Sequence, residues 1–432
     1  MLKKFFIPIA AACLGIPGAA PANSGSWMPN YDESKVLSYT LPELMKCKNG
    51  KVVTTVKEWE SIRRSEILAD YTKIMYGKFP EKAEKVEYEL LSEKKGAVNG
   101  KAIRREIRLY FTGKNQQKFH FDILLYLPEK VSGKVPVFAG LNFKGNHTVE
   151  NDPELRLSGL KFDPTPAGVS AARKKRGSRI HRFPLETIID RGYALATACY
   201  HDIFPDRKDG WQDSIYTLFY SKEELIKNPP HEKHSAIGAW SWGLRRIMDY
   251  LERVPEIDSG RAVVFGHSRL GKTALWTGAN DARFKLVCVN DAGEGGSALA
   301  RRNFGETLYS MCFIRKAMGN YWFVSGVKPY ADKVVQLPFD QHMLIALAAP
   351  RAIAVHSATE DLWADPKGEY LSAYHAGKVF ELYGKEPLKS AEMPPPETPV
   401  GSDVSYFLRT GKHDILLSDW QHYLDMADRL FK

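Results

Sequence analysis

Short, continuous apolar segments that alternate with helical patterns are the feature of this sequence that most restricts its fold. Such runs begin at Val135, Tyr193, Ala262, Leu286 and Ala352. Strands buried on both faces have this composition, and they occur mainly in parallel sheets. Helical spacing of apolar residues follows in the segments 234–254, 272–279, 371–382 and 420–430. The alternation predicts a doubly wound α/β fold.

Two earlier segments show a different pattern. Residues 101–112 and 118–127 alternate apolar and polar side chains around a short Gly-Lys-Asn linker, which predicts an antiparallel pair of strands. Residues 23–60 read as irregular, and residues 393–396 (Met-Pro-Pro-Pro) predict a surface loop before the last strand. A longer insertion, 150–185, carries the basic run Arg173 to Arg176.

The N-terminus has the pattern of a secretory signal peptide. Lys3 and Lys4 precede an apolar stretch that is too short to span a bilayer, and Ala20-Pro21-Ala22 gives a small-residue cleavage pattern before Asn23. We therefore expect a signal peptide over 1–22, a single domain over 23–432, and a periplasmic or secreted protein. The residues before Cys13 also loosely resemble a lipoprotein box, so a lipid anchor there stays open.

The charge balance is basic. The chain has 61 lysines and arginines against 51 aspartates and glutamates, a formal net charge of +10, and loss of the signal peptide would leave about +8. No signature of a nucleic-acid-binding fold is present, and an exported basic protein more naturally meets an acidic glycan. Four cysteines would remain after cleavage, and the sequence does not decide whether they are paired: Cys47, Cys199, Cys288 and Cys312.

The segment Gly266 to Thr273 combines a strand, a Gly-bounded turn and a helix, and two chemistries fit it. It matches the phosphate-binding loop G-x4-G-K-[ST]. It also resembles a nucleophile elbow, with Ser268 on the turn and a helix N-terminus that can stabilise an oxyanion. Expected export, the position after earlier parallel strands, and suitable acid and histidine partners downstream favour the elbow. The second glycine comes one residue later than in G-x-S-x-G, at Gly271.

Histidine and acid partners for Ser268 follow in the order of an α/β-hydrolase triad. His413 comes just after the last predicted strand, where the general base is expected. Two carboxylates compete for the acid: Glu294 lies in a Gly-rich turn after one strand, and Asp361 follows the next. His267, beside the nucleophile, is expected to pack locally.

Separate blocks of the sequence, in order, resemble the glucuronoyl esterases of carbohydrate esterase family 15. These blocks are Gly266-His-Ser-Arg-Leu-Gly-Lys272, Asn290-Asp-Ala-Gly-Glu-Gly-Gly296, Leu337 to His342, Asp361-Leu-Trp-Ala-Asp-Pro366 and Gly411-Lys-His413. The resemblance covers roughly residues 130–430. It implies an α/β-hydrolase, a three-layer sandwich with a mostly parallel central sheet.

The same resemblance implies roles for individual residues. Ser268 is the nucleophile, His413 the base, Glu294 the acid with Asp361 as the alternative, and Arg269 part of the oxyanion hole. Lys272 and Trp363 match positions that contact the hydroxyls of the uronate. A Gln and a Glu that fungal members carry are missing from the segment Met311 to Gly319, and the candidates to replace them are Glu306 and Gln341.

The implied reaction is hydrolysis of an ester on the carboxyl of (4-O-methyl)-glucuronic acid in glucuronoxylan, the link to lignin alcohols, through an acyl-enzyme. We expect no metal or other cofactor, no nucleic-acid partner and a monomer. Another exported serine hydrolase, such as an acetyl xylan esterase, is the alternative. The third hypothesis is a non-catalytic glycan-binding relative or a nucleotide-binding protein.

Overall fold

The computed structural model describes residues 27–80, 83–114, 116–315 and 321–432, so the expected signal peptide and Cys13 lie outside the described residues. The described chain forms one ten-stranded sheet in the order β1-β2-β3-β5-β4-β6-β7-β8-β10-β9. The strands are β1 Lys85–Gly96, β2 Ala102–Thr112, β3 Lys118–Pro128, β4 Val135–Asn142, β5 Ala194–Cys199, β6 Ile257–His267, β7 Phe284–Asn290, β8 Ala352–Ala358, β9 Val400–Gly401 and β10 Val404–Arg409.

The centre of the sheet is parallel, as the apolar runs predict. β5, β4, β6, β7, β8 and β10 pair in parallel, in that spatial order. All residues of β4, β5, β8 and β10 are buried. Their carboxyl ends therefore lie along one edge of the sheet, where α/β proteins place their sites.

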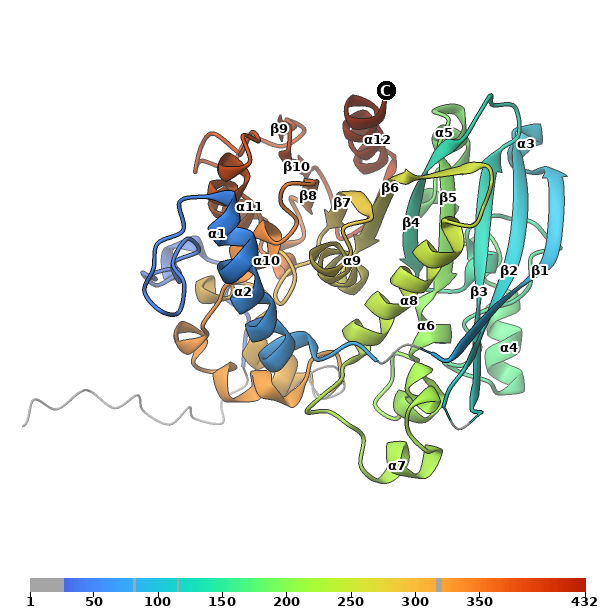
Figure 1. Cartoon of the computed structure of the whole chain (residues 1–432), viewed down its shortest axis with the longest axis horizontal. Helices are drawn as coiled ribbons and strands as arrows, with labels where there is room; N and C mark the ends of the chain where they lie inside the picture. The colour runs from blue at the N-terminus through green and yellow to red at the C-terminus, as the bar shows by residue number, and fades with distance from the viewer. Residues whose placement is uncertain (1–26, 81–82, 115, 316–320) are drawn as a thin grey trace, which may run out of the picture.

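The antiparallel part of the sheet is also as predicted, with one addition. β2 pairs with β3 from Ala102 opposite Pro128 to Thr112 opposite Lys118. The additional strand, β1, forms the outer edge and pairs with β2 (Figure 1). Its pairing register shifts between Leu90 and Ser92, and most of its side chains are at least partly exposed, so its sequence lacks a clean alternation.

Helices cover both faces of the sheet (Figure 1). On β6, Val264 packs in one core with α8 and α9, whereas its neighbours Val263 and Phe265 pack in a second core with α5 and α12. This alternation makes the predicted three-layer sandwich. The helices are α1 Val56–Glu58, α2 Arg64–Tyr71, α3 Ala97–Gly100, α4 Pro166–Arg173, α5 Leu185–Asp190, α6 Tyr200–Ile203, α7 Lys222–Lys227, α8 Ala236–Leu251, α9 Arg269–Asn280, α10 Gln341–Ala346, α11 Pro366–Leu382 and α12 Leu417–Phe431.

The N-terminal segment is less irregular than its sequence suggests. Thr55 and Glu58 form a capping box that starts a helical stretch at Val56, within the range predicted to be irregular. Trp59 and Tyr71 from this stretch are fully buried in the larger core. The segment is thus part of the packed molecule.

The four cysteines of the described chain are buried free thiols: Cys47, Cys199, Cys288 and Cys312. Among the described residues, no helix is long and apolar enough to cross a membrane.

Candidate active site

Ser268 occupies a strained turn between β6 and α9. Its φ of 58° and ψ of −131° are unusual for a residue other than glycine, and such strain is typical of functional sites. Its backbone N–H donates to the carbonyl of Asn290 at the end of β7 (2.8 Å), which fixes the turn to the neighbouring strand. The amide groups of the first turn of α9 follow directly, as an oxyanion hole requires.

Gly266 allows this turn to close. A Cβ at Gly266 would lie 2.0 Å from the carbonyl oxygen of Leu270 and 2.8 Å from the nitrogen of Gly271. We expect Gly266→Ala to displace the start of α9, lower activity strongly and destabilise the fold by roughly 1–3 kcal/mol. Thermal unfolding and ester hydrolysis measure both effects. Gly260→Ala, also in β6, is the control, because its Cβ would approach only the end of the Asp258 side chain. Equal behaviour of the two variants would contradict the expectation.

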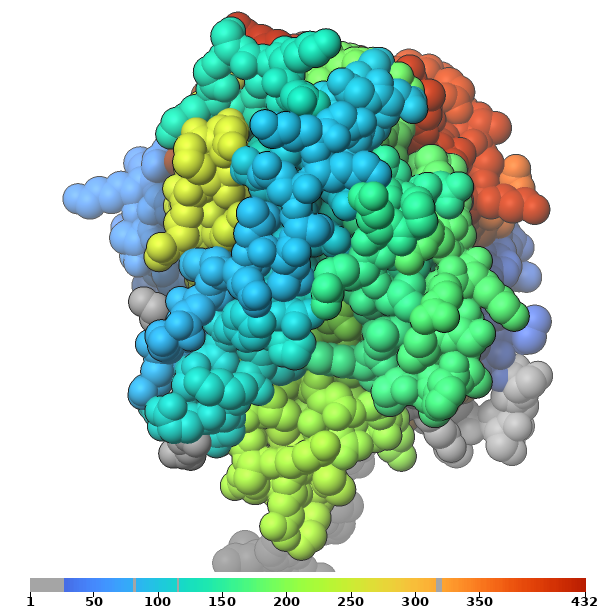
Figure 2. All heavy atoms as spheres, turned by 90° about the vertical axis from the view of Figure 1, so that its right-hand side faces the viewer, coloured from blue at the N-terminus to red at the C-terminus, as the bar shows by residue number. Residues whose placement is uncertain are grey.

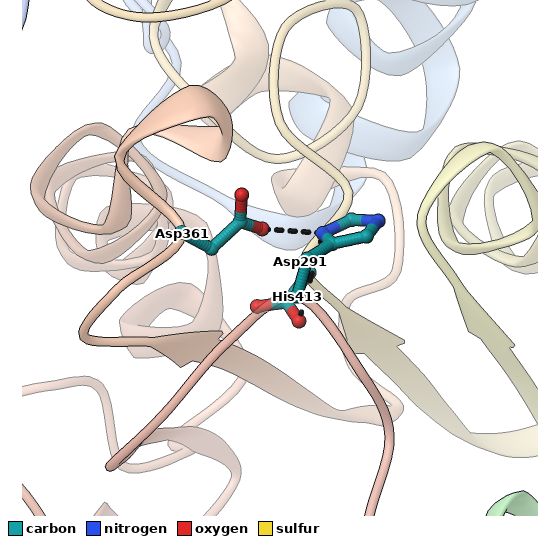
Figure 3. A group of neighbouring side chains, drawn as sticks. All are labelled: Asp291, Asp361 and His413. Carbon is teal, nitrogen blue, oxygen red and sulfur yellow. Dashed lines mark hydrogen bonds and ion pairs between the residues drawn. The ribbon is translucent and has the colours of Figure 1, made fainter.

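His413 lies beyond the end of β10 and contacts an aspartate that follows β8. The distance between His413 Nδ1 and Asp361 Oδ2 is 2.5 Å (Figure 3). The His413 side chain is 40% exposed and that of Asp361 only 4%. A carboxylate bonded to Nδ1 fixes the tautomer in which Nε2 can accept a proton. The structure thus pairs His413 with the alternative acid of the sequence analysis.

Glu294, the first candidate for the acid, is not the carboxylate that bonds to His413. Its carboxylate accepts from the amide of Gly295 (3.0 Å), and no contact with His413 is present among the described residues. Gly293 and Gly295 have φ values of 59° and 63°, and the loop turns Glu294 into the interior near Tyr76. Burial, followed by the nearby carboxylate of Asp340, raises the pKa of Glu294 well above its usual value. The expectation that Glu294 contacts His413 is therefore wrong.

A second carboxylate, Asp291, lies under His413 (Figure 3) and was not a candidate acid from sequence. Its Oδ2 is 3.9 Å from His413 Nδ1, and neither of its buried oxygens has a hydrogen-bond partner. Burial and the neighbouring carboxylates Glu369 and Asp361 raise its pKa well above the usual range. Ligand atoms of Asp291, Asp361 and His413 all lie within 4.8 Å of one another, close enough to hold a metal ion.

A buried network below the site fixes the loop that carries His413. Arg409 donates to the carbonyls of Lys412 and Asp414, both at 2.8 Å. Its Nε donates to Asp419 (3.0 Å), which also accepts from Asn290 (3.2 Å). Because Arg409 ends β10 and Asn290 ends β7, the network ties the nucleophile and histidine loops together. His267 packs locally, as expected, with its Nδ1 bonded to Asn290 and its ring 4.5 Å from that of His413.

Arg269, which follows Ser268, is held by an aspartate from the loop after α6. Its guanidinium pairs with Asp206 and lies 4.6 Å over the ring of Trp322. Asp206 also accepts from Tyr200, Tyr321 and Trp322, at 2.8, 2.9 and 2.7 Å. Burial opposes ionisation of Asp206, but Arg269 and these donors outweigh it and keep its pKa below the usual value. Sequence reasoning missed Asp206, because no local pattern marks a partner 63 residues away.

Ser268 and His413 line a common cavity of about 340 Å³. Its walls comprise Ser268, Arg269, Lys272, Asp291, Ala292, Gly293, Glu306, Arg315, Trp322, Asp361, Trp363, Ala364 and His413. The predicted nucleophile and base, both aspartates and three of the four predicted substrate-binding residues thus meet in one place. A cavity of this size fits one sugar ring with its ester.

Lys272 and Glu306 form a buried pair on one wall of this cavity. Lys272 Nζ lies 3.1 Å from Glu306 Oε2 and donates to the carbonyls of Ala292 (2.5 Å) and Glu294 (2.7 Å). The Lys272 side chain is 3% exposed and already bound, which does not suit the exposed phosphate contact of a nucleotide loop. Trp363 lines the same cavity, with the guanidinium of Arg315 4.8 Å over its ring.

Gln341, the fourth predicted substrate-binding residue, is placed elsewhere. It begins α10, is fully buried, and its side-chain oxygen is 3.5 Å from the Tyr71 hydroxyl in the core. It does not line the cavity. The expectation for Gln341 is therefore wrong, because the capping of α10 by Asp340 turns this segment inward.

Glu369 of α11 supports the site from below and was not predicted. It accepts from the amide of Gly293 (2.9 Å) and the hydroxyls of Ser297 and Ser357, both at 2.5 Å. Burial raises its pKa to about 7. It holds the loop after β7 against β8.

Comparisons with known proteins show the family of the chain. The family model "Glucuronyl esterase, fungi" matches residues 186–384. "Carbohydrate esterase MZ0003", from an unknown prokaryotic organism, is 41% identical over 92% of this chain and 91% of its own length.

Solved structures give the same result. A glucuronoyl esterase from Solibacter usitatus superposes with a TM-score of 0.83 at 39% identity, over 93% of this chain and all of that one. A promiscuous CE15 esterase from a marine bacterial metagenome gives 0.82 at 40% identity, over 93% and 99%. The chain therefore belongs to the glucuronoyl esterases of carbohydrate esterase family 15, and it is a carboxylic ester hydrolase.

Proposed function

We propose that this enzyme hydrolyses the ester that joins the carboxyl of (4-O-methyl)-glucuronic acid in glucuronoxylan to lignin alcohols. One observation carries the proposal: the strained Ser268 shares a cavity with the His413–Asp361 pair. Glucuronoyl esterases are among the relatives, and their name indicates the acid part of the ester. Glucuronoxylan as the polymer and lignin alcohols as the leaving groups are our own proposal.

In the first half of the reaction, Ser268 Oγ attacks the ester carbonyl and His413 Nε2 takes its proton. Asp361 stabilises the imidazolium that results, because its carboxylate is bonded to Nδ1. Negative charge develops on the carbonyl oxygen, where the backbone amides at the start of α9 and the Arg269 guanidinium can donate. One such donor is typically worth about 3–4 kcal/mol of the barrier.

In the second half, His413 returns the proton to the alcohol, which leaves, and the glucuronoyl group stays bound to Ser268. A water molecule then attacks the acyl-enzyme, with His413 as base, and glucuronate is released. The substrate is an uncharged ester and the product is an anion. Arg269 and Lys272 are each paired with a carboxylate, Asp206 and Glu306, so the product does not face two unpaired cations.

The wall opposite the triad would bind the sugar. Glu306 and Lys272 can exchange hydrogen bonds with hydroxyl groups, and the partly exposed ring of Trp363 offers an apolar face. The position of Glu306, 3.1 Å from Lys272 Nζ and 3.8 Å from Arg315 Nη1, supports a part in sugar binding.

A panel of esters tests the proposal. Purified protein should hydrolyse benzyl and methyl esters of glucuronic acid at least about 100-fold more efficiently, by kcat/KM, than acetylated xylan or p-nitrophenyl acetate, because differential binding in one polar cavity can supply this ratio. Faster hydrolysis of acetyl esters would favour the acetyl xylan esterase alternative. Comparison of 4-O-methylated and unmethylated glucuronates measures the preference at that position.

We further propose that residues 1–22 are a removed signal peptide and that residues 23–432 are one catalytic domain that acts outside the cytoplasm as a monomer. The N-terminal pattern and the A-x-A site before Asn23 support export. Mass spectrometry of the mature protein checks the cleavage site, and it also reveals any lipid on Cys13.

A further inference from the structure

The basic insertion noted in the sequence lies beside the active site. The amides of Gly177 and Arg179 donate to the carbonyls of His147 (3.0 Å) and Thr148 (2.9 Å), in the loop that follows β4. That loop reaches the catalytic edge of the sheet, because β4 runs parallel to β6 beside it. Figure 2 shows the insertion, in teal to green, on the surface next to β1 and β2.

Phe143, at the start of this loop, connects the insertion to the catalytic residues. Its ring lies 6.0 Å from the ring of His267, with the guanidinium of Arg269 at 5.8 Å and that of Arg182 at 5.7 Å. Arg179 and Arg182 also line a small apolar hollow with Phe143 and His267. The insertion therefore places Arg179 and Arg182 next to Phe143, which in turn contacts His267 and Arg269 beside Ser268.

Several of these cations have no acidic partner. Arg182 pairs with Asp414 (2.6 Å), and Arg176 donates to the carbonyls of Asp152 and Leu155. For Lys144, Lys175 and Arg179, by contrast, the described part of the chain offers no side-chain hydrogen bond or ion pair. Lys144 and Lys175 are exposed and Arg179 is partly exposed. We call these three residues the basic cluster.

The cations of the basic cluster act on one another. Although the Lys144 side chain as a whole is exposed, partial desolvation of its ammonium group, followed by the charges of Lys175, Arg179 and Arg269, lowers its pKa. Like charges held together without a counter-charge cost free energy, and a bound anion removes that cost. The cluster thus resembles a surface built for an anionic partner.

The ester at Ser268 cannot be that anion. Esterification removes the charge from the uronate that enters the cavity, and Arg269 and Lys272 already have partners there. An anion bound at the basic cluster must therefore be a different group on the same substrate molecule or on another one. In a glycan with several uronates, the unesterified ones carry free carboxylates.

From this geometry we infer that Lys144, Lys175 and Arg179 form a docking surface for free carboxylates of the glycan chain whose esterified uronate occupies the cavity. The inference rests on the proposed function, since it takes the substrate to be a polymer with more than one uronate. The docking surface makes the enzyme more efficient on acidic chains than on isolated esters, through electrostatic attraction that salt weakens.

The test compares a triple variant, Lys144→Gln with Lys175→Gln and Arg179→Gln, with the unchanged protein on two substrates. On benzyl glucuronate, which is neutral, kcat/KM should stay within about twofold. On glucuronoxylan with part of its uronates methyl-esterified and the rest free, kcat/KM at low ionic strength should fall by about tenfold or more, mostly through KM. Its dependence on salt should weaken in parallel.

Two controls separate the docking surface from general charge effects. A second triple variant changes Lys95, Lys130 and Lys134 to Gln; all three are exposed and lie near the amino end of β4, at the opposite edge of the sheet. It removes the same charge and should leave both substrates unaffected. A fully esterified, neutral glucuronoxylan should not distinguish the cluster variant from the unchanged protein.

The outcomes are distinct. Equal loss on the neutral ester and the acidic polymer, equal loss in both triple variants, or no loss on the acidic polymer would each overturn the docking surface. Inhibition of the unchanged protein by DNA as strong as by unesterified glucuronoxylan would also overturn it, because the cluster would then select charge alone. Failure of the proposed function would appear separately, as absent hydrolysis of benzyl glucuronate by the unchanged protein.

Discussion

Ser268→Ala should reduce kcat for benzyl glucuronate by roughly 10⁴–10⁶-fold and abolish the acyl-enzyme. The elbow presents this hydroxyl in the cavity that His413 also lines, and its backbone conformation is one that few residues adopt without a functional reason. Because alanine removes only the oxygen, the fold and the unfolding temperature should change little. Steady-state kinetics and intact-mass detection of the acyl-enzyme during turnover measure the effect.

Ser61→Ala is the matched control for this variant. Ser61 is exposed on the N-terminal helical stretch, and its hydroxyl donates to the carbonyl of Lys57. Its loss should leave kcat unchanged. If the Ser268 variant kept more than about a tenth of the activity while folding normally, the covalent mechanism would be excluded and the assignment of the elbow would fail.

Asp361→Asn should produce the second largest loss, on the order of 10³–10⁴-fold in kcat. An amide at this position can donate its N–H₂ to His413 Nδ1. The imidazole would then carry its proton on Nε2, where it must accept one from Ser268. The variant also removes the charge that stabilises the imidazolium. The pH profile of kcat distinguishes this loss from simple unfolding. The low-pH side of the profile, which reports ionisation of the general base, should shift or vanish.

The other two carboxylates near the site provide the controls. Asp291→Asn should lower kcat by less than about tenfold, since Asp291 lies 3.9 Å from His413 Nδ1 and makes no hydrogen bond to it. Glu294→Gln should leave the pH profile unchanged. Loss of activity in the Asp291 variant with retention in the Asp361 variant would instead make Asp291 the acid. Assays with and without EDTA test whether the trio needs a metal ion.

The central features of the fold were readable from the sequence because they are local. Burial on both faces leaves a continuous apolar run in β4, β5, β7 and β8, and the turn from β6 to α9 requires glycine at Gly266. Edge strand β1 was missed because one face of it is solvated and its register shifts at Leu90. The helical start at Val56 was missed because its signal, the capping box at Thr55, is short.

The sequence by itself determined the parallel centre of the sheet, the position of Ser268 on its turn, and His413 after the last strand, since each depends on neighbours along the chain. Only the tertiary structure decided which acid reaches His413, that Gln341 is buried in the core, and that Asp206 holds Arg269. These contacts join loops that leave different strands, and the directions of the loops follow from packing and glycine conformations that no spacing encodes. For the same reason, only the fold showed that Arg179 and Arg182 of the basic insertion line a hollow together with Phe143 and His267.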